Sequence, residues 1–119
     1  MATFGAATQD AILALLATEG AFVSLHTEDP GTTGTGELTA TGYARQAITF
    51  TEPDGVMSND DTITFGPAVD EWPEATYFGL WDAVTAGNFV GAAQLDTART
   101  VPALGSASFG EGALEVSFP

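Results

Sequence analysis

The stretch Ala75–Ala83, with the sequence ATYFGLWDA, is the most apolar extended segment of this 119-residue chain and decides its fold. In an extended strand Tyr77 and Trp81 fall on one face and Phe78 falls on the other. Apolar residues on both faces are typical of a strand that is covered on both sides. We therefore expect a central β-strand here. Gly79, flanked by aromatic residues, predicts a bulge or a close approach of backbone.

Shorter segments with the same two-residue period lie on both sides of this strand. Turn-forming residues separate them, among them EPDG at 52–55 and the Gly66-Pro67 pair. We therefore expect a mainly β fold, a β-sandwich or barrel-like arrangement of about six to eight short antiparallel strands with one N-terminal α-helix. The length fits a single domain, 1–119, with the β module over 21–119. The flanking strands expected are 22–26, 43–51, 62–65, 89–95, 106–109 and 114–118.

The segment before these strands has helical periodicity. Its apolar residues recur three and four positions apart, which predicts a helix over about residues 8–19. Thr8 can cap the helix, and Asp10 is expected in the first turn, where the helix dipole favours an anion. Gly20 supplies the stop.

Charge is the strongest compositional signal. The chain has sixteen Asp and Glu residues but only two basic residues, Arg45 and Arg99, and no lysine, so its net charge is −14. Such a surface repels phosphate backbones and anionic membranes, so we expect no nucleic-acid partner and no membrane partner. Two explanations remain: adaptation to very high salt, which screens the repulsion, or a partner that carries positive charge. The absence of lysine favours the first.

The residues that could carry catalysis form no recognisable set. His26 is the only histidine, and Ser24 precedes it on the same strand face. Same-face neighbours on one strand lie about 7 Å apart, which is too far for a nucleophile and its base. Carboxylate pairs such as Asp60-Asp61 lie in polar loops and match no calcium-binding spacing. We therefore expect no enzyme activity, no metal and no cofactor.

Four segments carry a family resemblance when they are taken in chain order. They are AFVSLHTEDPG at 21–31, GYARQ at 42–46, TYFGLWDA at 76–83, and an ending that runs from RTVPALG at 99–105 to GAL at 112–114. Together they resemble a family of small tailed-phage virion proteins, variously described as tail fibre, head fibre or head decoration proteins. That family has no catalytic residues to transfer. Combined with the acidity, the resemblance implies a haloarchaeal tailed virus.

The resemblance implies a virion structural protein. Our leading expectation is a capsid decoration or turret component that binds the outer head shell as a homotrimer. The partners would be the major capsid protein or other virion proteins, and the particle would be assembled in the host cytoplasm. One alternative is a tail fibre or baseplate-associated protein. Another is a carbohydrate-binding module for the host surface, which would need exposed aromatic rings.

Four residues are candidates for contacts with other proteins. Ile12 and Leu16 share one helix face, which either docks on the sheet of the same chain or contacts another subunit. Arg45, among so many acids, is expected to pair with carboxylates, within the chain in preference to a neighbouring subunit. Trp72 lies in a polar loop, 68–74, and is the best candidate among the aromatic residues for an exposed contact.

Overall fold

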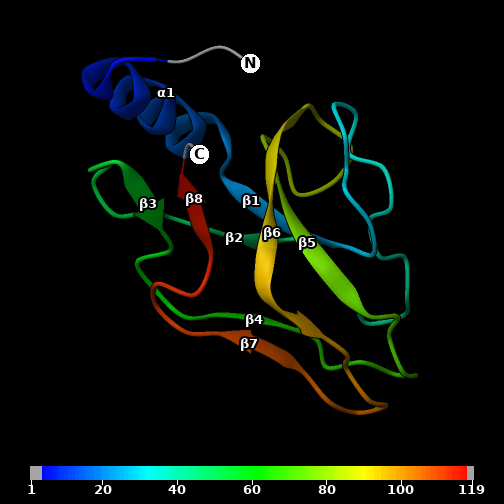
Figure 1. Ribbon diagram of the computed structural model, residues 1–119. Helices are drawn as coiled ribbons and strands as arrows, with labels where there is room; N and C mark the ends of the chain where they lie inside the picture. The colour runs from blue at the N-terminus through cyan, green and yellow to red at the C-terminus, as the bar shows by residue number, and fades with distance from the viewer. Residues whose placement is uncertain (1–3, 118–119) are drawn as a thin grey trace.

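The computed structural model describes residues 4–117 and confirms a mainly β fold. This part of the chain contains one helix and eight short strands that pair antiparallel, and the strands form an open, sandwich-like arrangement without a closed barrel (Figure 1). The elements are α1 (Ala6–Glu19), β1 (Phe22–His26), β2 (Gln46–Ala47), β3 (Val56–Ser58), β4 (Ile63–Phe65), β5 (Ala75–Trp81), β6 (Phe89–Arg99), β7 (Ala107–Phe109) and β8 (Glu115–Ser117).

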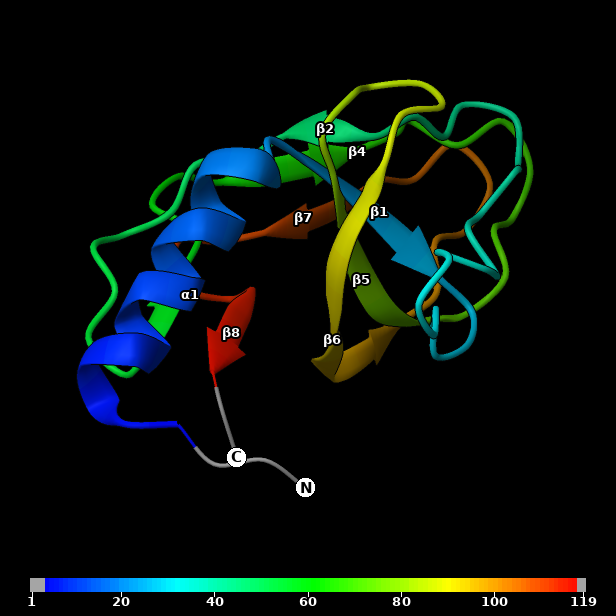
Figure 2. The ribbon, with the colours of Figure 1, turned by 90° about the horizontal axis from the view of Figure 1, so that it is seen from above.

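The strand β5 lies inside the largest sheet, as its two apolar faces predict. That sheet has the order β2-β1-β5-β6. β1 and β5 pair along the full length of β1, from Phe22 opposite Trp81 to His26 opposite Tyr77. Two smaller sheets, β3-β8 and β4-β7, complete the fold. Figure 2 shows α1 beside β3 and β8 at one end of the molecule.

The apolar core lies between one face of the large sheet and the β4-β7 sheet. Val23 and Leu25 of β1 meet Phe78 of β5 there, and each is at most 1% exposed. Phe65 of β4 and Phe109 of β7 close the core from the other side, with their rings edge to face at 6.0 Å. Burying a side chain of this size stabilises the fold by about 1.5–3 kcal/mol. The core therefore holds the two sheets together.

The opposite face of the large sheet is also covered, by the loop between β1 and β2. Ser24 and His26 are fully buried on this face and Trp81 is 8% exposed. Gly34 in the covering loop shows how close the contact is, because a Cβ added there would stand 2.5 Å from the Trp81 ring. Its φ of +82° also lies in the region that favours glycine. This second, partly polar core carries the site described below.

The helix begins before the predicted position. Its N-cap is Gly5, which has no side-chain hydrogen bond to offer, so the expected capping by Thr8 is wrong. The expected place of Asp10 is also wrong, since it lies beyond the first turn and accepts a hydrogen bond from the Gly55 N–H at 2.8 Å. Gly20 ends the helix as predicted. Within residues 4–117, no helix has the length and apolar character needed to cross a membrane.

Several strands differ from the expected ranges because long-range pairing sets their ends. β2 has only two residues; just after it the Ile48 N–H donates to the Ala21 carbonyl at 3.0 Å, and Phe50 forms a bridge with Asn59. β3 was not expected at all, and it pairs with β8. The predicted close approach at Gly79 is confirmed, and the pairing of β5 with β6 shifts register two residues later. Phe118, placed by the sequence in the last strand, lies outside the described residues.

Candidate functional site

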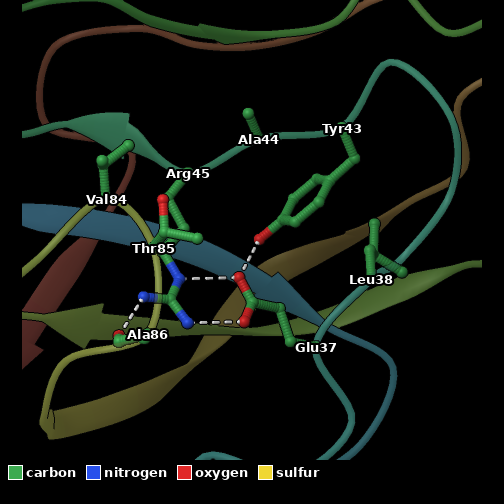
Figure 3. A pocket seen from close by; sticks show the side chains of 8 residues that line it. All are labelled: Glu37, Leu38, Tyr43, Ala44, Arg45, Val84, Thr85 and Ala86. Carbon is green, nitrogen blue, oxygen red and sulfur yellow. Dashed lines mark hydrogen bonds and ion pairs between the residues drawn. The ribbon is translucent and has the colours of Figure 1, made fainter.

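Arg45 occupies the centre of the most connected polar group in the structure, between the loop before β2 and the hairpin loop that joins β5 to β6. Its Nε and Nη2 groups donate to the two carboxylate oxygens of Glu37, both at 2.9 Å. Its Nη1 group donates to the Ala86 carbonyl at 2.8 Å (Figure 3). The same group donates to the Ala83 carbonyl at 3.0 Å. The predicted pairing of Arg45 within the chain is therefore confirmed. A bidentate pair of this kind fixes orientation as well as charge.

The guanidinium of Arg45 also lies flat over an aromatic ring. Its Cζ atom is 3.7 Å from the centre of the Trp81 ring. The Arg45 side chain is 8% exposed and that of Glu37 is 20% exposed, so water screens the pair only weakly. We call Glu37, Tyr43, Arg45 and Trp81 the Arg45 cluster. It binds two loops to the face of the large sheet.

Tyr43 extends the cluster into the sheet. Its hydroxyl donates to a carboxylate oxygen of Glu37 at 2.8 Å and accepts the backbone N–H of Leu25 at 3.0 Å. Burial raises the pKa of Tyr43 well above its ordinary range. Burial also acts to raise the pKa of Glu37, but the hydrogen bonds from Arg45 and Tyr43 outweigh it and the pKa is lowered. Glu37 is therefore a carboxylate at neutral pH.

Trp81 connects the Arg45 cluster to a buried pair, Ser24 and His26, whose separation was predicted incorrectly from the sequence. The Trp81 Nε1–H donates to the Ser24 hydroxyl oxygen at 2.8 Å, and Ser24 Oγ lies 2.6 Å from His26 Nε2. The expectation that Ser24 and His26 are too far apart to interact is wrong. The 7 Å spacing applies to the backbone, whereas these side chains lean toward each other. Gly79 on β5 leaves the room, since a Cβ there would stand 2.7 Å from both groups.

The protonation of His26 follows from its partners. Its Nδ1 lies 2.8 Å from the Thr35 carbonyl, which can only accept, so Nδ1 carries the hydrogen and Nε2 accepts from the Ser24 hydroxyl. Burial lowers the pKa of His26, which keeps the ring neutral. The arrangement has the hydrogen bond of a nucleophile and its base, but both side chains are 0% exposed. A substrate carbonyl has no access to the Ser24 oxygen.

The other three residues predicted to contact other proteins, Trp72, Ile12 and Leu16, lie outside the Arg45 cluster. Trp72 is 1% exposed and its Nε1–H donates to the Thr41 carbonyl at 3.2 Å, so this candidate for an exposed contact is buried instead. Its ring meets that of Tyr43 edge to face at 5.7 Å. Ile12 and Leu16 are half-buried against the same chain. Sequence reasoning missed Glu37, which no local pattern separates from the other acids.

The Arg45 cluster borders a small cavity, and its polar atoms are already hydrogen-bonded within the protein. A cavity of about 290 Å³ opens beside it, with Leu38, Val84 and Thr85 on its walls (Figure 3). That volume is at the lower limit of small-molecule pockets. In residues 4–117 every buried side-chain nitrogen and oxygen has a hydrogen-bond partner. The same part of the chain has no group of three His, Cys, Asp or Glu residues placed to hold a metal.

Comparison with protein families gives the class of protein. A family model described as Podophage GP4 fiber I protein gp80 matches residues 6–117, so the chain belongs to this family. The family is one of phage virion proteins described as fibre proteins, which confirms the resemblance to virion proteins found in the sequence and supports a virion structural role. A comparison with curated proteins found no match.

Proposed function

We propose that this chain is the folded subunit of a fibre on the virion, assembled there as a homotrimer with other virion proteins. The observation that carries the proposal is the family match, which spans residues 6–117 and leaves no second module in the described chain. Fibre subunits need shape and contacts rather than chemistry. A closed cyclic assembly is the usual way for identical subunits to satisfy their contacts.

The Arg45 cluster supports a structural role, because it fixes the conformation of two loops. Arg45 holds the hairpin loop 82–88 through two carbonyls, and Glu37 holds the loop before β2 through its carboxylate. These bonds are largely shielded from water, and removing one partner of such a pair costs about 3–5 kcal/mol. Loops fixed in this way keep one shape on an exposed particle surface.

Decoration of the head shell is the second candidate, and it was the leading expectation from the sequence. A compact module suits that role equally well, but the family description favours the fibre. The carbohydrate-binding alternative needs exposed rings. Trp72 and Trp81 instead pack inside the protein, at 1% and 8% exposure.

Imaging of the particle tests the location. Antibodies raised against the purified chain should label fibres, and a reconstruction of the virion should place this fold in them in groups of three. Label spread evenly over the head shell, with the fold at capsid lattice positions, would overturn the fibre proposal and support decoration. Copy number per fibre would test the homotrimer independently.

We also propose that the protein is not an enzyme and that its virus infects a halophilic archaeon. The burial of Ser24 and His26 supports the first statement, and the net charge of −14 supports the second. Purified protein should hydrolyse neither glycans nor peptides. A turnover above background that disappears in His26→Ala, but persists in a variant of an exposed residue such as Thr64→Ala, would contradict the structural role.

A further inference from the structure

Leu104 is the most exposed of the large apolar side chains in residues 4–117, at 82% exposure. Its backbone also lies in the left-handed region, with a φ of +66°. That conformation is unfavourable for a residue with a Cβ, whereas glycine adopts it freely. Leucine at this position therefore serves neither the core nor the turn, which points to a contact outside the chain.

Two loops hold Leu104 in place. The Ala68 N–H donates to the Gly105 carbonyl at 2.8 Å, and the Leu104 N–H donates to the Ala68 carbonyl at 2.9 Å. Ala68 and Val101 anchor the two loops in the core, at 2% and 3% exposure. Figures 1 and 2 show these loops, green after β4 and orange after β6, at the end of the molecule opposite α1. Because the backbone is already fixed, a partner would bind the side chain with little further loss of conformational entropy.

The surface around Leu104 is apolar, with carboxylates at its border. Four more apolar residues are exposed in the same two loops: Pro67, Val69, Pro102 and Ala103. We call these four residues and Leu104 the Leu104 tip. Three exposed acidic residues follow Val69 in its loop: Asp70, Glu71 and Glu74. An apolar centre with a polar rim is the usual anatomy of a protein–protein contact.

Charge determines which protein could cover the Leu104 tip. A second copy of the chain would bring its own surplus of carboxylates against Asp70 and Glu71. It has only two cations to offer in return. The Arg45 side chain is 8% exposed and is paired with Glu37, and the guanidinium of Arg99 lies over an aromatic ring of its own chain. The complementary surface therefore belongs to a different protein, one that carries basic residues.

We propose that the Leu104 tip docks into an apolar pocket of a different virion protein, with Leu104 as the anchor and lysine on the pocket rim opposite Asp70 and Glu71. In such contacts a few side chains that fill a pocket near the centre carry most of the binding energy. Ion pairs at the rim are partly shielded from water, so molar salt weakens them less than it weakens repulsion between exposed charges. The inference deepens the proposed virion role, on which it rests, by naming the attachment surface and the chemistry of its partner.

Two matched glycine variants separate attachment from stability. Leu104→Gly and Ala86→Gly each replace an exposed residue of left-handed φ, and the φ of Ala86 is +53°. Both variants should keep the wild-type melting temperature or raise it by a few degrees, because glycine relieves the strain. A lower melting temperature for Leu104→Gly alone would show that Leu104 serves the fold, and it would overturn the proposal.

Incorporation into particles is the readout for attachment. Infected cells make one variant together with the wild type, so that particles still assemble, and mass spectrometry of purified virions gives the ratio of the two proteins. Leu104→Gly should be incorporated at least about tenfold less than the wild type, which corresponds to about 1.4 kcal/mol of lost binding. Ala86→Gly should be incorporated as well as the wild type. Equal incorporation of the two variants would overturn the proposal.

Carbodiimide cross-linking of wild-type virions identifies the partner. The reagent joins carboxylates to nearby amino groups, and the chain has no lysine. A cross-link from Asp70 or Glu71 to a lysine therefore reports a different protein, and we expect one. Cross-links from these two residues only to the amino terminus of a second copy would overturn the proposal, as would none from them while other carboxylates of the chain react.

These results distinguish the inference from the proposed fibre location. A lysine cross-link supports the Leu104 tip whether the partner belongs to a fibre or to the head shell, and imaging alone decides between those two places. Absence of the chain from purified virions would instead refute the virion role and the inference together.

Discussion

Replacing Gly79 by alanine would insert a methyl group into the buried pair of Ser24 and His26. The added Cβ would stand 2.7 Å from His26 Nε2 and 2.7 Å from Ser24 Oγ, with the Phe89 ring at 3.2 Å. Carbon in van der Waals contact with these atoms needs about 3.5 Å or more. Both side chains are fully buried, so neither can turn into solvent to make room.

The expected cost has two parts. Overpacking a well-filled core costs about 1–3 kcal/mol, and leaving a buried hydrogen-bonding group without its partner costs about 1–3 kcal/mol more. We therefore expect Gly79→Ala to lower the free energy of unfolding by about 2–6 kcal/mol. Total stability of a domain is about 5–15 kcal/mol. The melting temperature should fall by about 10 °C or more.

Gly91 on the neighbouring strand offers a matched control. A Cβ there would meet only the Leu16 side chain, at 3.7 Å, which is ordinary contact. Gly91→Ala should be neutral or should stabilise by about 0.4–1 kcal/mol, because alanine restricts the unfolded chain. Denaturant titrations of both variants in molar KCl measure the difference. If Gly79→Ala costs no more than Gly91→Ala, the proposed role of Gly79 in making room for the pair is refuted.

Three further predictions concern charge. Arg45→Lys should lower the free energy of unfolding by about 2 kcal/mol or more in denaturant titrations, since lysine cannot reproduce the two hydrogen bonds to the Glu37 carboxylate. Arg99→Lys loses a single carbonyl hydrogen bond and a ring contact and should lower it by less than about 1 kcal/mol. Equal losses of stability would contradict the reasoning. Wild-type stability should fall as pH drops below about 6.5, where the unfolded histidine takes up a proton that the folded ring, with its lowered pKa, resists. His26→Gln should lack this component, and parallel pH profiles for the two proteins would exclude it. The melting temperature of the wild type should rise steeply from 0.1 M to molar KCl, because the screening length shortens from about 10 Å to about 3 Å; a flat or falling series would instead indicate a basic partner.

Local sequence was sufficient to predict an element where the residues of that segment alone determine its structure. Ala75–Trp81 is apolar on both faces and is buried between β1 and β6. Gly20 marks the helix end because only a small residue fits there, with Leu80 Cβ at 2.9 Å from an added Cβ. Arg45 pairing was predictable because acids outnumber cations so heavily. Glu37 could not be predicted as the partner of Arg45, because their pairing depends on how two loops meet in the folded protein.

Other features depend on partners that are remote in sequence. β3 has only three residues and Val56 is 39% exposed, so nothing within it indicates a strand until β8 pairs with it. Trp72 lies among Asp70, Glu71 and Glu74, and these neighbours predict exposure. The ring is buried because it packs in the apolar core, where a carbonyl from a different loop accepts its N–H. Composition of the surrounding loop therefore gave the wrong environment for the side chain.

The strand pairing also determines when the protein can fold during its synthesis. Phe22 pairs with Trp81, Ile63 with Phe109, and Val56 with Ser117, so β3 and β4 have no partners until the last two strands have left the ribosome. Folds with such non-local pairing form slowly, in about milliseconds to seconds. Until then the waiting strand edges could join those of neighbouring chains. In dilute salt the surplus of carboxylates keeps unfinished chains apart, so the same repulsion that opposes folding there also opposes aggregation. Molar salt screens both effects.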